Sequence, residues 1–151
     1  MEDKLRIYLD MCCYNRPYDN QSQARIANET QSKLHIQDLI VRGELDLVGS
    51  YVLDYECSCN PFEIRRSFIE DFISKNVKLY VGAERDGIIT EMAKIIMGTG
   101  VKEKDAYHIA AAIYADCDYF LTTDKRLLKF RNNRIKMINP IAFVDEMEGK
   151  S

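Results

Sequence analysis

Short apolar runs alternate along this chain with longer stretches in which apolar residues recur at helical spacing. Such runs, bounded by charged or turn residues, are typical of buried strands. We expect strands at Leu5–Leu9, Leu45–Val48, Val77–Val81, Tyr119–Leu121 and Ile135–Ile138. The longer stretches predict helices at Gln21–Arg42, Val52–Cys59, Phe62–Ser74, Ala83–Met97, Lys102–Cys117 and Pro140–Met147, with a short helix from Lys125. Strands separated by helical crossovers predict a three-layer α/β/α sandwich around a mainly parallel sheet of about five strands.

Turn-forming residues mark several of the expected boundaries. Gly43 is expected to end the first long helix. Gly98-Thr-Gly100 is expected to end the helix at Ala83–Met97. In Asn60-Pro61, Asn is a favoured cap and Pro suits the first helical position, so a helix is expected to start there. Residues 12–20, which include Pro17, are expected to form a loop.

Length and composition narrow the classes of protein. A chain of 151 residues that is 46% hydrophobic suits a single domain, which we place at 1–148, with a tail at 149–151. No apolar run reaches the roughly 20 residues that cross a bilayer, and the first residues lack the pattern of a signal peptide. The five cysteines lack the spacing of a disulfide framework, which indicates free thiols in a reducing compartment. We therefore expect a cytoplasmic protein with no membrane segment.

The net charge of −3 gives no overall signal for nucleic acid, because proteins that bind phosphates electrostatically are usually basic. The local distribution is different. Residues 125–136 contain six basic side chains and no acid: Lys125, Arg126, Lys129, Arg131, Arg134 and Lys136. This segment is either a basic patch for phosphates or a solvated face followed by a turn.

Four acids stand where this fold would gather ligands. Asp10 and Asp124 follow two of the expected strands, Asp105 lies at the start of an apolar helix, and Glu56 comes shortly after the second strand. Ligands of open α/β sheets bind outside the carboxyl ends of the strands. Carboxylates grouped there repel one another unless a cation neutralises them, and oxygen ligands favour Mg²⁺ or Mn²⁺ over zinc.

Each acid also has a purely structural alternative. Asp124 is well placed to cap the helix after it, Asp105 to favour its helix dipole, and Asp10 to end a turn. Glu56 taken alone resembles a surface acid. The joint occurrence of the four at positions that the fold predicts is what favours a metal site.

The motifs around these acids resemble the PIN domain family, the fold of VapC-like toxin ribonucleases. The resemblance rests on Ile7-Tyr-Leu-Asp10, Tyr55-Glu56, Asp105-Ala-Tyr-His-Ile-Ala-Ala-Ala and Leu121-Thr-Thr-Asp124-Lys-Arg-Leu-Leu, and it covers nearly the whole chain. It implies that Asp10, Glu56, Asp105 and Asp124 occupy the acidic positions of the family and that the protein cleaves RNA with Mg²⁺ or Mn²⁺. Family members commonly have Thr or Ser and Asn after the first Asp. This chain has Met11-Cys12-Cys13 instead, which removes a hydroxyl or amide from the site, and Asn15-Arg16 is a candidate substitute.

The implied mechanism is metal-assisted hydrolysis, in which a cation lowers the pKa of bound water and stabilises charge on the phosphate. Asp10, Asp105 and Asp124 are expected to hold the metal. Glu56 is expected to bind it directly or through water, or to orient the nucleophile. We assign phosphate contacts, which position a strand without reading its sequence, to Arg16, Lys125 and Arg126.

Other chemistry-bearing residues receive structural interpretations. The pairs Cys12-Cys13 and Cys57/Cys59 are poor matches to zinc spacing, and we expect small buried side chains there. His108 is expected to be a packed or locally hydrogen-bonded histidine rather than a general base. Tyr14 and Tyr18 are expected to cover their loop rather than to stack on bases.

Three functions fit these residues to different degrees. The first is a metal-dependent endoribonuclease acting on RNA, as the toxin of a toxin–antitoxin pair with a separate antitoxin chain, and forming a homodimer. The alternative is a PIN-like module with weak or no catalysis that binds nucleic acid or protein. A phosphoryl-transfer enzyme of haloacid-dehalogenase type is disfavoured, because that family expects a second Asp where this chain has Cys12.

Overall fold

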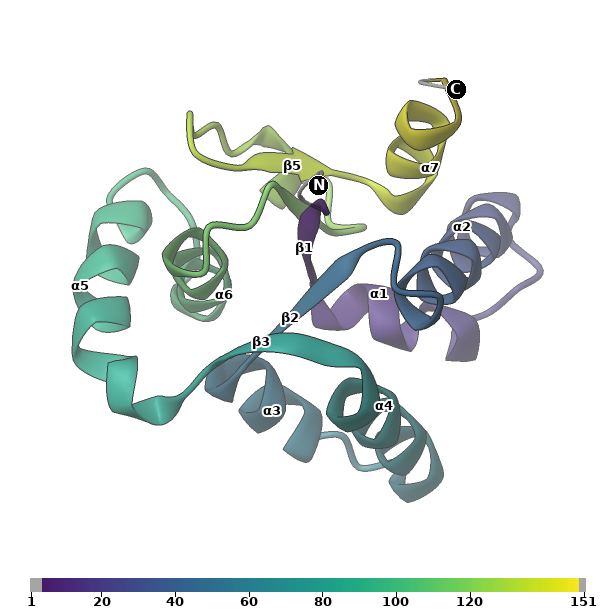
Figure 1. Cartoon of the computed structure of the whole chain (residues 1–151), viewed down its shortest axis with the longest axis horizontal. Coiled ribbons are helices and arrows are strands. Elements are labelled where there is room, and N and C mark those ends of the chain that lie inside the picture. The colour runs from purple at the N-terminus through teal and green to yellow at the C-terminus, as the bar shows by residue number, and fades with distance from the viewer. Residues whose placement is uncertain (1–3, 150–151) are drawn as a thin grey trace.

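The computed structural model describes residues 4–149 and has a sheet of five parallel strands at its centre (Figure 1). The strands are β1 (Arg6–Leu9), β2 (Asp46–Ser50), β3 (Val77–Val81), β4 (Tyr119–Leu121) and β5 (Lys136–Ile138). Their order across the sheet is β3-β2-β1-β4-β5, and every neighbouring pair is parallel. The predicted parallel sheet is confirmed.

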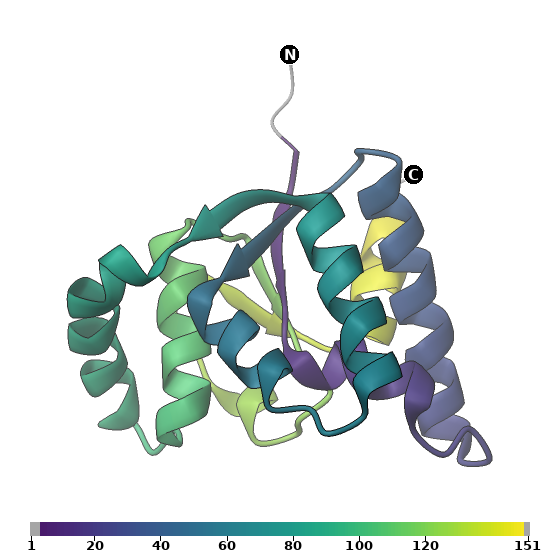
Figure 2. The same cartoon turned by 90° about the horizontal axis from the view of Figure 1, so that it is seen from below.

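Helices cover both faces of this sheet. Those in the described residues are α1 (Met11–Asn15), α2 (Ala24–Val41), α3 (Tyr51–Ser58), α4 (Glu63–Asn76), α5 (Asp86–Met97), α6 (Glu103–Tyr114) and α7 (Pro140–Gly149). On one side α5 packs against α6, and on the other α2 packs against α7 (Figures 1 and 2). The layers are therefore helix, sheet and helix, as the alternation in the sequence predicts.

The central strand, β1, is the point where the strand order changes direction. After β1 the chain builds outward through β2 and β3, then crosses back to the other side of β1 to form β4 and β5. Ligands of open α/β folds bind in the crevice at such a switch point, at the carboxyl ends of the strands. The fold therefore directs attention to Asp10, the residue that follows β1.

The register of the central strands brings their carboxyl ends level. Leu9 pairs with Leu121, and the Asp10 amide donates a hydrogen bond of 2.9 Å to the Leu121 carbonyl. The core strands are buried on both faces, which accounts for their continuous apolar sequences. Helix α6 presents the buried alanines at 106 and 110–112, so it packs closely, as its small side chains predict.

The prediction of a loop at residues 12–20 is wrong. The chain instead forms α1 directly after β1 and then a 3₁₀ helix over Arg16–Tyr18. The Asp10 carboxylate accepts a hydrogen bond from the Met11 amide and so caps α1. The side chains of Met11, Cys13 and Tyr14 in this helix are buried. Capping and burial, both of which require the neighbouring strands, stabilise a helix that local sequence does not indicate.

Several helix boundaries also differ from expectation. Helix α6 ends at Tyr114 rather than at Cys117, because Asp116 adopts a left-handed conformation with φ of 57°. Helix α4 begins at Glu63, and Asn60 acts just before it, where its side chain accepts a hydrogen bond from the Phe62 amide. The short helix expected from Lys125 is a 3₁₀ turn over Leu127–Lys129.

The C-terminal end of the described residues differs in part from the expected tail. Gly149, placed in the expected tail, belongs to α7, whereas residues 150 and 151 of that tail lie outside the described residues. Within residues 4–149, no helix is long and apolar enough to cross a membrane.

Candidate metal centre

Asp10 is held at the end of β1 by three donors. Its Oδ1 accepts from the Met11 amide at 2.9 Å, and its Oδ2 accepts from the Thr122 hydroxyl at 2.9 Å and from the Cys12 thiol at 3.4 Å. The side chain is only 7% exposed, and burial raises the pKa of Asp10 well above its ordinary value. A cation beside this carboxylate would offset the cost of burying its charge.

Glu56 reaches the same place from α3. Ser50, the last residue of β2, caps α3 by accepting from the Leu53 amide at 3.0 Å, which fixes the direction in which the helix leaves the sheet. Glu56 follows within this helix, and its Oε2 pairs with the Lys104 ammonium at 3.1 Å. Burial raises the pKa of Glu56, but hydrogen bonding and electrostatic interaction, first with His108 and then with Lys104, outweigh burial and leave the pKa below its ordinary value.

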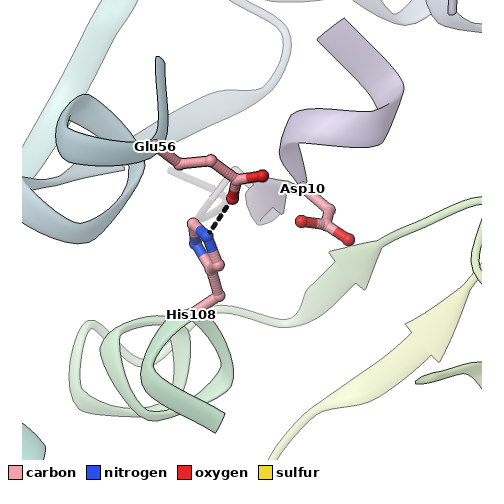
Figure 3. Close-up of side chains that lie close together, drawn as sticks. All are labelled: Asp10, Glu56 and His108. Atoms are coloured by element: carbon pink, nitrogen blue, oxygen red, sulfur yellow. Dashed lines mark hydrogen bonds and ion pairs between the residues drawn. The ribbon is translucent and has the colours of Figure 1, made fainter. Parts of the chain in front are cut away.

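His108 completes the group from α6. Its Nε2 lies 2.7 Å from Glu56 Oε1, and its Nδ1 lies 2.7 Å from the Tyr8 hydroxyl. Asp10, Glu56 and His108 each place a potential ligand atom within 4.8 Å of the other two (Figure 3). The expected packing of this histidine is confirmed, since His108 is fully buried, but its hydrogen-bond partners are distant in sequence rather than local.

Asp105 and Asp124 lie beside this group and line a neighbouring surface hollow of about 340 Å³. Burial, and then the charge of Asp124, raise the pKa of Asp105 above its ordinary value. Asp124 is exposed, and its Oδ1 accepts from the Arg126 amide at 2.8 Å. This bond closes a local turn, but the 3₁₀ turn at Leu127–Lys129 that follows has no side-chain cap, so the helix-capping alternative for Asp124 is wrong. Neither Asp105 nor Asp124 belongs to the group that Asp10, Glu56 and His108 form.

The three predicted phosphate contacts differ in what holds them. Arg16 pairs with Asp19 and with buried Glu29, each at 2.8 Å. Burial lowers the pKa of Arg16, but these two carboxylates outweigh it and hold the pKa above its usual value. Arg126 is exposed and lines the hollow with Asp105 and Asp124, whereas Lys125 is exposed outside its lining.

The cysteines are free thiols, as expected from their spacing. Cys13 and Cys57 are buried and Cys12 is half-buried, but Cys59 is exposed, so the expectation of four buried side chains is wrong there. Tyr14 is buried, consistent with the covering role expected of it.

A divalent cation fits the residues present. Asp10 and Glu56 supply carboxylate oxygens from two different elements at the switch point of the sheet. Oxygen donors of this kind suit Mg²⁺ or Mn²⁺. The acidic group in the described residues could therefore hold a metal ion.

No family model matches the sequence, and no curated protein matches it. Among solved structures, the chain is similar in fold to a chain of VapBC2 from Rickettsia felis, a structure bound to a DNA fragment from its promoter. The TM-score is 0.55 and the identity 12%, over 88% of this chain and 98% of the other. At this identity the likeness establishes the fold, a three-layer α/β/α sandwich of PIN type.

Thr122 supports the centre, and sequence reasoning missed it. The hydroxyl that is absent after Asp10 in the sequence comes instead from the residue that follows β4, since Thr122 Oγ1 donates to Asp10 Oδ2. The signal was present in Thr122-Thr123-Asp124, where the Thr pair follows the strand beside β1. Tyr8 was missed as well, because it reads as a core position of a strand, and Ser50 was missed because it lies between the expected strand and the expected helix.

Proposed function

We propose that this protein is an endoribonuclease that hydrolyses RNA phosphodiester bonds with Mg²⁺ or Mn²⁺. One observation supports this function most directly. The Asp10 and Glu56 carboxylates meet at the switch point of a PIN-like sheet, and a hollow with two further acids adjoins them. The buried Asp10 carboxylate is costly for the fold unless it serves a cation.

The roles of the side chains follow from their positions. Asp10 and Glu56 would hold the cation, and Asp105 and Asp124 would complete the ligand set from the adjoining hollow. When bound, a divalent cation supplies Lewis-acid polarisation of the phosphoryl group and lowers the pKa of a bound water. Thr122 fixes the Asp10 carboxylate through its hydroxyl, so that the carboxylate needs no reorganisation when a cation arrives.

The hollow offers a path for the RNA backbone. Besides the two acids, it is lined by four basic side chains: Lys102, Arg126, Lys129 and Arg131. Cations placed next to a metal centre would hold the phosphates that flank the cleaved one. Arg126 is therefore the best placed of the predicted phosphate contacts, with Lys125 next to it in sequence. Arg16 would have to exchange its two carboxylate partners for phosphate.

Glu56 also lines an apolar recess of about 510 Å³. Tyr55, whose side chain is exposed, and Tyr107 line this recess together with Glu56 and Lys104. Exposed aromatic rings beside a phosphate path are suited to stacking on unpaired bases. We therefore propose single-stranded RNA as the substrate, with a base adjacent to the cleaved phosphate in this recess.

The test is cleavage of a panel of single-stranded and structured RNAs by purified protein, with Mg²⁺, Mn²⁺ or a chelator. Cleavage by wild type is expected to need the cation and to be lost in Asp10→Asn. The matched control is Asp71→Asn, which makes the same change at an exposed position on α4. Equal cleavage by wild type and Asp10→Asn would disprove the assignment.

The alternative proposal is a PIN-like module that binds nucleic acid or protein but cleaves weakly or not at all. The observation in its favour is that protein donors already occupy both carboxylates, through Thr122 and Cys12 on Asp10 and through His108 and Lys104 on Glu56. Folded protein that binds Mn²⁺ and RNA without turnover would support this alternative.

We further propose a protein partner of antitoxin type, supported by the fold likeness to a chain of the VapBC2 complex. Expression of wild type in a bacterial host is expected to arrest growth, and Asp10→Asn to relieve the arrest. A homodimer is also proposed, and light scattering after size-exclusion chromatography measures it directly. The cytoplasmic location stays a prediction.

A further inference from the structure

A chain of hydrogen bonds runs from the core of the sheet to Glu56. The Leu53 amide donates to Ser50 Oγ at 3.0 Å, and Ser50 Oγ lies 2.8 Å from the Tyr8 hydroxyl. The chain continues from Tyr8 to His108 Nδ1 at 2.7 Å, and from His108 Nε2 to Glu56 Oε1 at 2.7 Å. Ser50, Tyr8 and His108 are each fully buried, at 0% exposure.

We propose that His108 is a positioning residue of the metal centre and not one of its ligands. In this role the imidazole donates from Nε2 and holds the Glu56 carboxylate in place for the cation. The inference rests on the proposed function, because it assigns Glu56 to a metal site. It separates the three clustered residues into two ligands, Asp10 and Glu56, and one support.

The direction of donation along this chain of hydrogen bonds follows from where the hydroxyl protons find acceptors. Ser50 Oγ already accepts from the Leu53 amide, and in residues 4–149 its only other hydrogen-bond partner is the Tyr8 hydroxyl. Since a buried hydroxyl proton without an acceptor costs about 1–3 kcal/mol, Ser50 donates to the Tyr8 oxygen. Tyr8 must then place its own proton on His108 Nδ1, which acts as the acceptor.

The state of the imidazole is then determined. An accepting Nδ1 carries no proton, so the ring proton lies on Nε2 and is donated to Glu56 Oε1. The opposite tautomer would point a nitrogen lone pair at a carboxylate oxygen. An imidazolium would reverse the Tyr8 bond and leave the Ser50 proton without an acceptor. The neutral Nε2–H form satisfies every donor and acceptor in the chain.

This arrangement excludes His108 from the ligand set. Both ring nitrogens are used inside the protein, so neither lone pair is available to a cation. The hydrogen bond between His108 and Glu56 also connects α3 to α6. The His108 side chain is held in the packed core. The other partner of Glu56, Lys104, is 66% exposed and is therefore much easier to displace. Partners of this kind, which orient a ligand, typically contribute about 10–100-fold to metal affinity.

The first experiment is NMR of the imidazole nitrogens, using two-bond ¹H–¹⁵N correlations. The chain has two histidines, and His35→Gln assigns the signals of His108. We expect the neutral Nε2–H pattern at about pH 7, retained when Mg²⁺ is added. A neutral Nδ1–H pattern or an imidazolium pattern would overturn the proposal, as would loss of the pattern through coordination of a ring nitrogen.

The second experiment compares Mn²⁺ affinity in two variants by calorimetry. His108→Gln places an amide N–H near the position of Nε2, whereas His108→Asn places its amide near Nδ1 and cannot reach Glu56. We expect Mn²⁺ affinity to fall roughly 10–100-fold in the Asn variant and to be largely restored in the Gln variant. Equal losses in the two variants, both shown to be folded by circular dichroism, would refute a positioning role.

A third variant guards against a simple folding defect. Tyr8→Phe keeps the ring in the core but removes the donor to Nδ1, so the Nε2–H form should lose its dominance in the NMR spectrum. An unchanged tautomer would contradict the proposed direction of the chain.

The outcomes also separate this inference from the proposed function. If wild type cleaves no RNA but binds Mn²⁺ with the expected difference between Gln and Asn, the positioning role holds and the ribonuclease does not. If wild type cleaves RNA and His108→Asn keeps full Mn²⁺ affinity, the ribonuclease stands and the positioning role falls. Failure of wild type to bind Mn²⁺ would overturn the positioning role.

Discussion

Lys33 is a charged side chain buried between helices away from the metal centre, and replacing it should stabilise the protein. Its ammonium group donates to Gln37 Oε1 at 2.6 Å and lies 5.6 Å from the ring centroid of Tyr14 and 5.8 Å from that of Phe72. No carboxylate pairs with it among the described residues. Burial lowers the pKa of Lys33 from 10.5 to about 8, with a smaller opposing effect from Cys13. We predict that Lys33→Met is more stable than wild type at neutral pH.

The magnitude follows from proton linkage. The native state releases the Lys33 proton near pH 8 and the unfolded chain near 10.5, so the stability of wild type rises with pH between these values. At about 1.36 kcal/mol per pH unit, the charged form costs roughly 3 kcal/mol below pH 8. The two ring contacts and the hydrogen bond return part of this, each about 0.5–1.5 kcal/mol. We expect Lys33→Met to gain about 1–3 kcal/mol at pH 7, and a gain of 2 kcal/mol raises the unfolding midpoint by about 4–8 °C.

The assay is urea unfolding followed by far-UV circular dichroism, which suits a chain without Trp. Wild type and Lys33→Met are compared at about pH 7 and about pH 10, and the difference between them isolates Lys33 from other titrating groups. The advantage of the variant should shrink by roughly 2 kcal/mol at the higher pH, because wild-type Lys33 is then neutral in the native state. Lys94→Met, at a side chain that is 67% exposed, is the control and should show little change.

Two results would refute this reasoning. A stability difference that is constant from about pH 7 to about pH 10 would mean that Lys33 keeps its charge in the native state. A variant less stable than wild type at neutral pH would mean that the ring contacts and the Gln37 hydrogen bond outweigh the cost of burial.

Three further predictions concern the metal centre and the sheet. Asp10→Asn should raise the thermal midpoint of the metal-free protein, because burial makes the ionised carboxylate costly, and Mn²⁺ should no longer raise it; a lower midpoint contradicts this. Mn²⁺ affinity measured by calorimetry should weaken from about pH 7 to about pH 5, because protons compete for Asp10 and Asp105, whose pKa values burial raises. Gly49→Ala should lower the free energy of unfolding by about 1–3 kcal/mol in urea, since its Cβ would lie 2.8 Å from Val77 Cγ2; an unchanged value would show that Val77 yields freely.

The sequence determined the layers and most of the elements through local pattern. Tyr119–Leu121 was predicted with its observed bounds, because buried parallel strands are short, apolar and sharply bounded. Val77–Val81 was also predicted with its observed bounds, although this edge strand is largely exposed. Gly43, at φ of 77°, ends α2 as predicted, since glycine adopts this conformation without strain. Local signals failed where stability comes from distant partners, as in α1, which depends on the Asp10 cap and on burial.

The same distinction between local sequence signals and distant contacts applies to the candidate site. Asp10 and Asp124 could be placed in advance, because an acid after a buried strand must emerge at the carboxyl edge of the sheet. The sequence also grouped Glu56 with Asp10, but it could not show that Glu56 lies nearer to Asp10 than Asp105 and Asp124 do, or that Thr122 supplies a hydroxyl, because these contacts depend on which elements become neighbours. His108 stands 100 residues from Tyr8 and 52 from Glu56 in the sequence, so it can connect these two residues only after the fold has formed. Sequence pattern thus determined where chemistry could occur, and the tertiary contacts decided which side chains meet there.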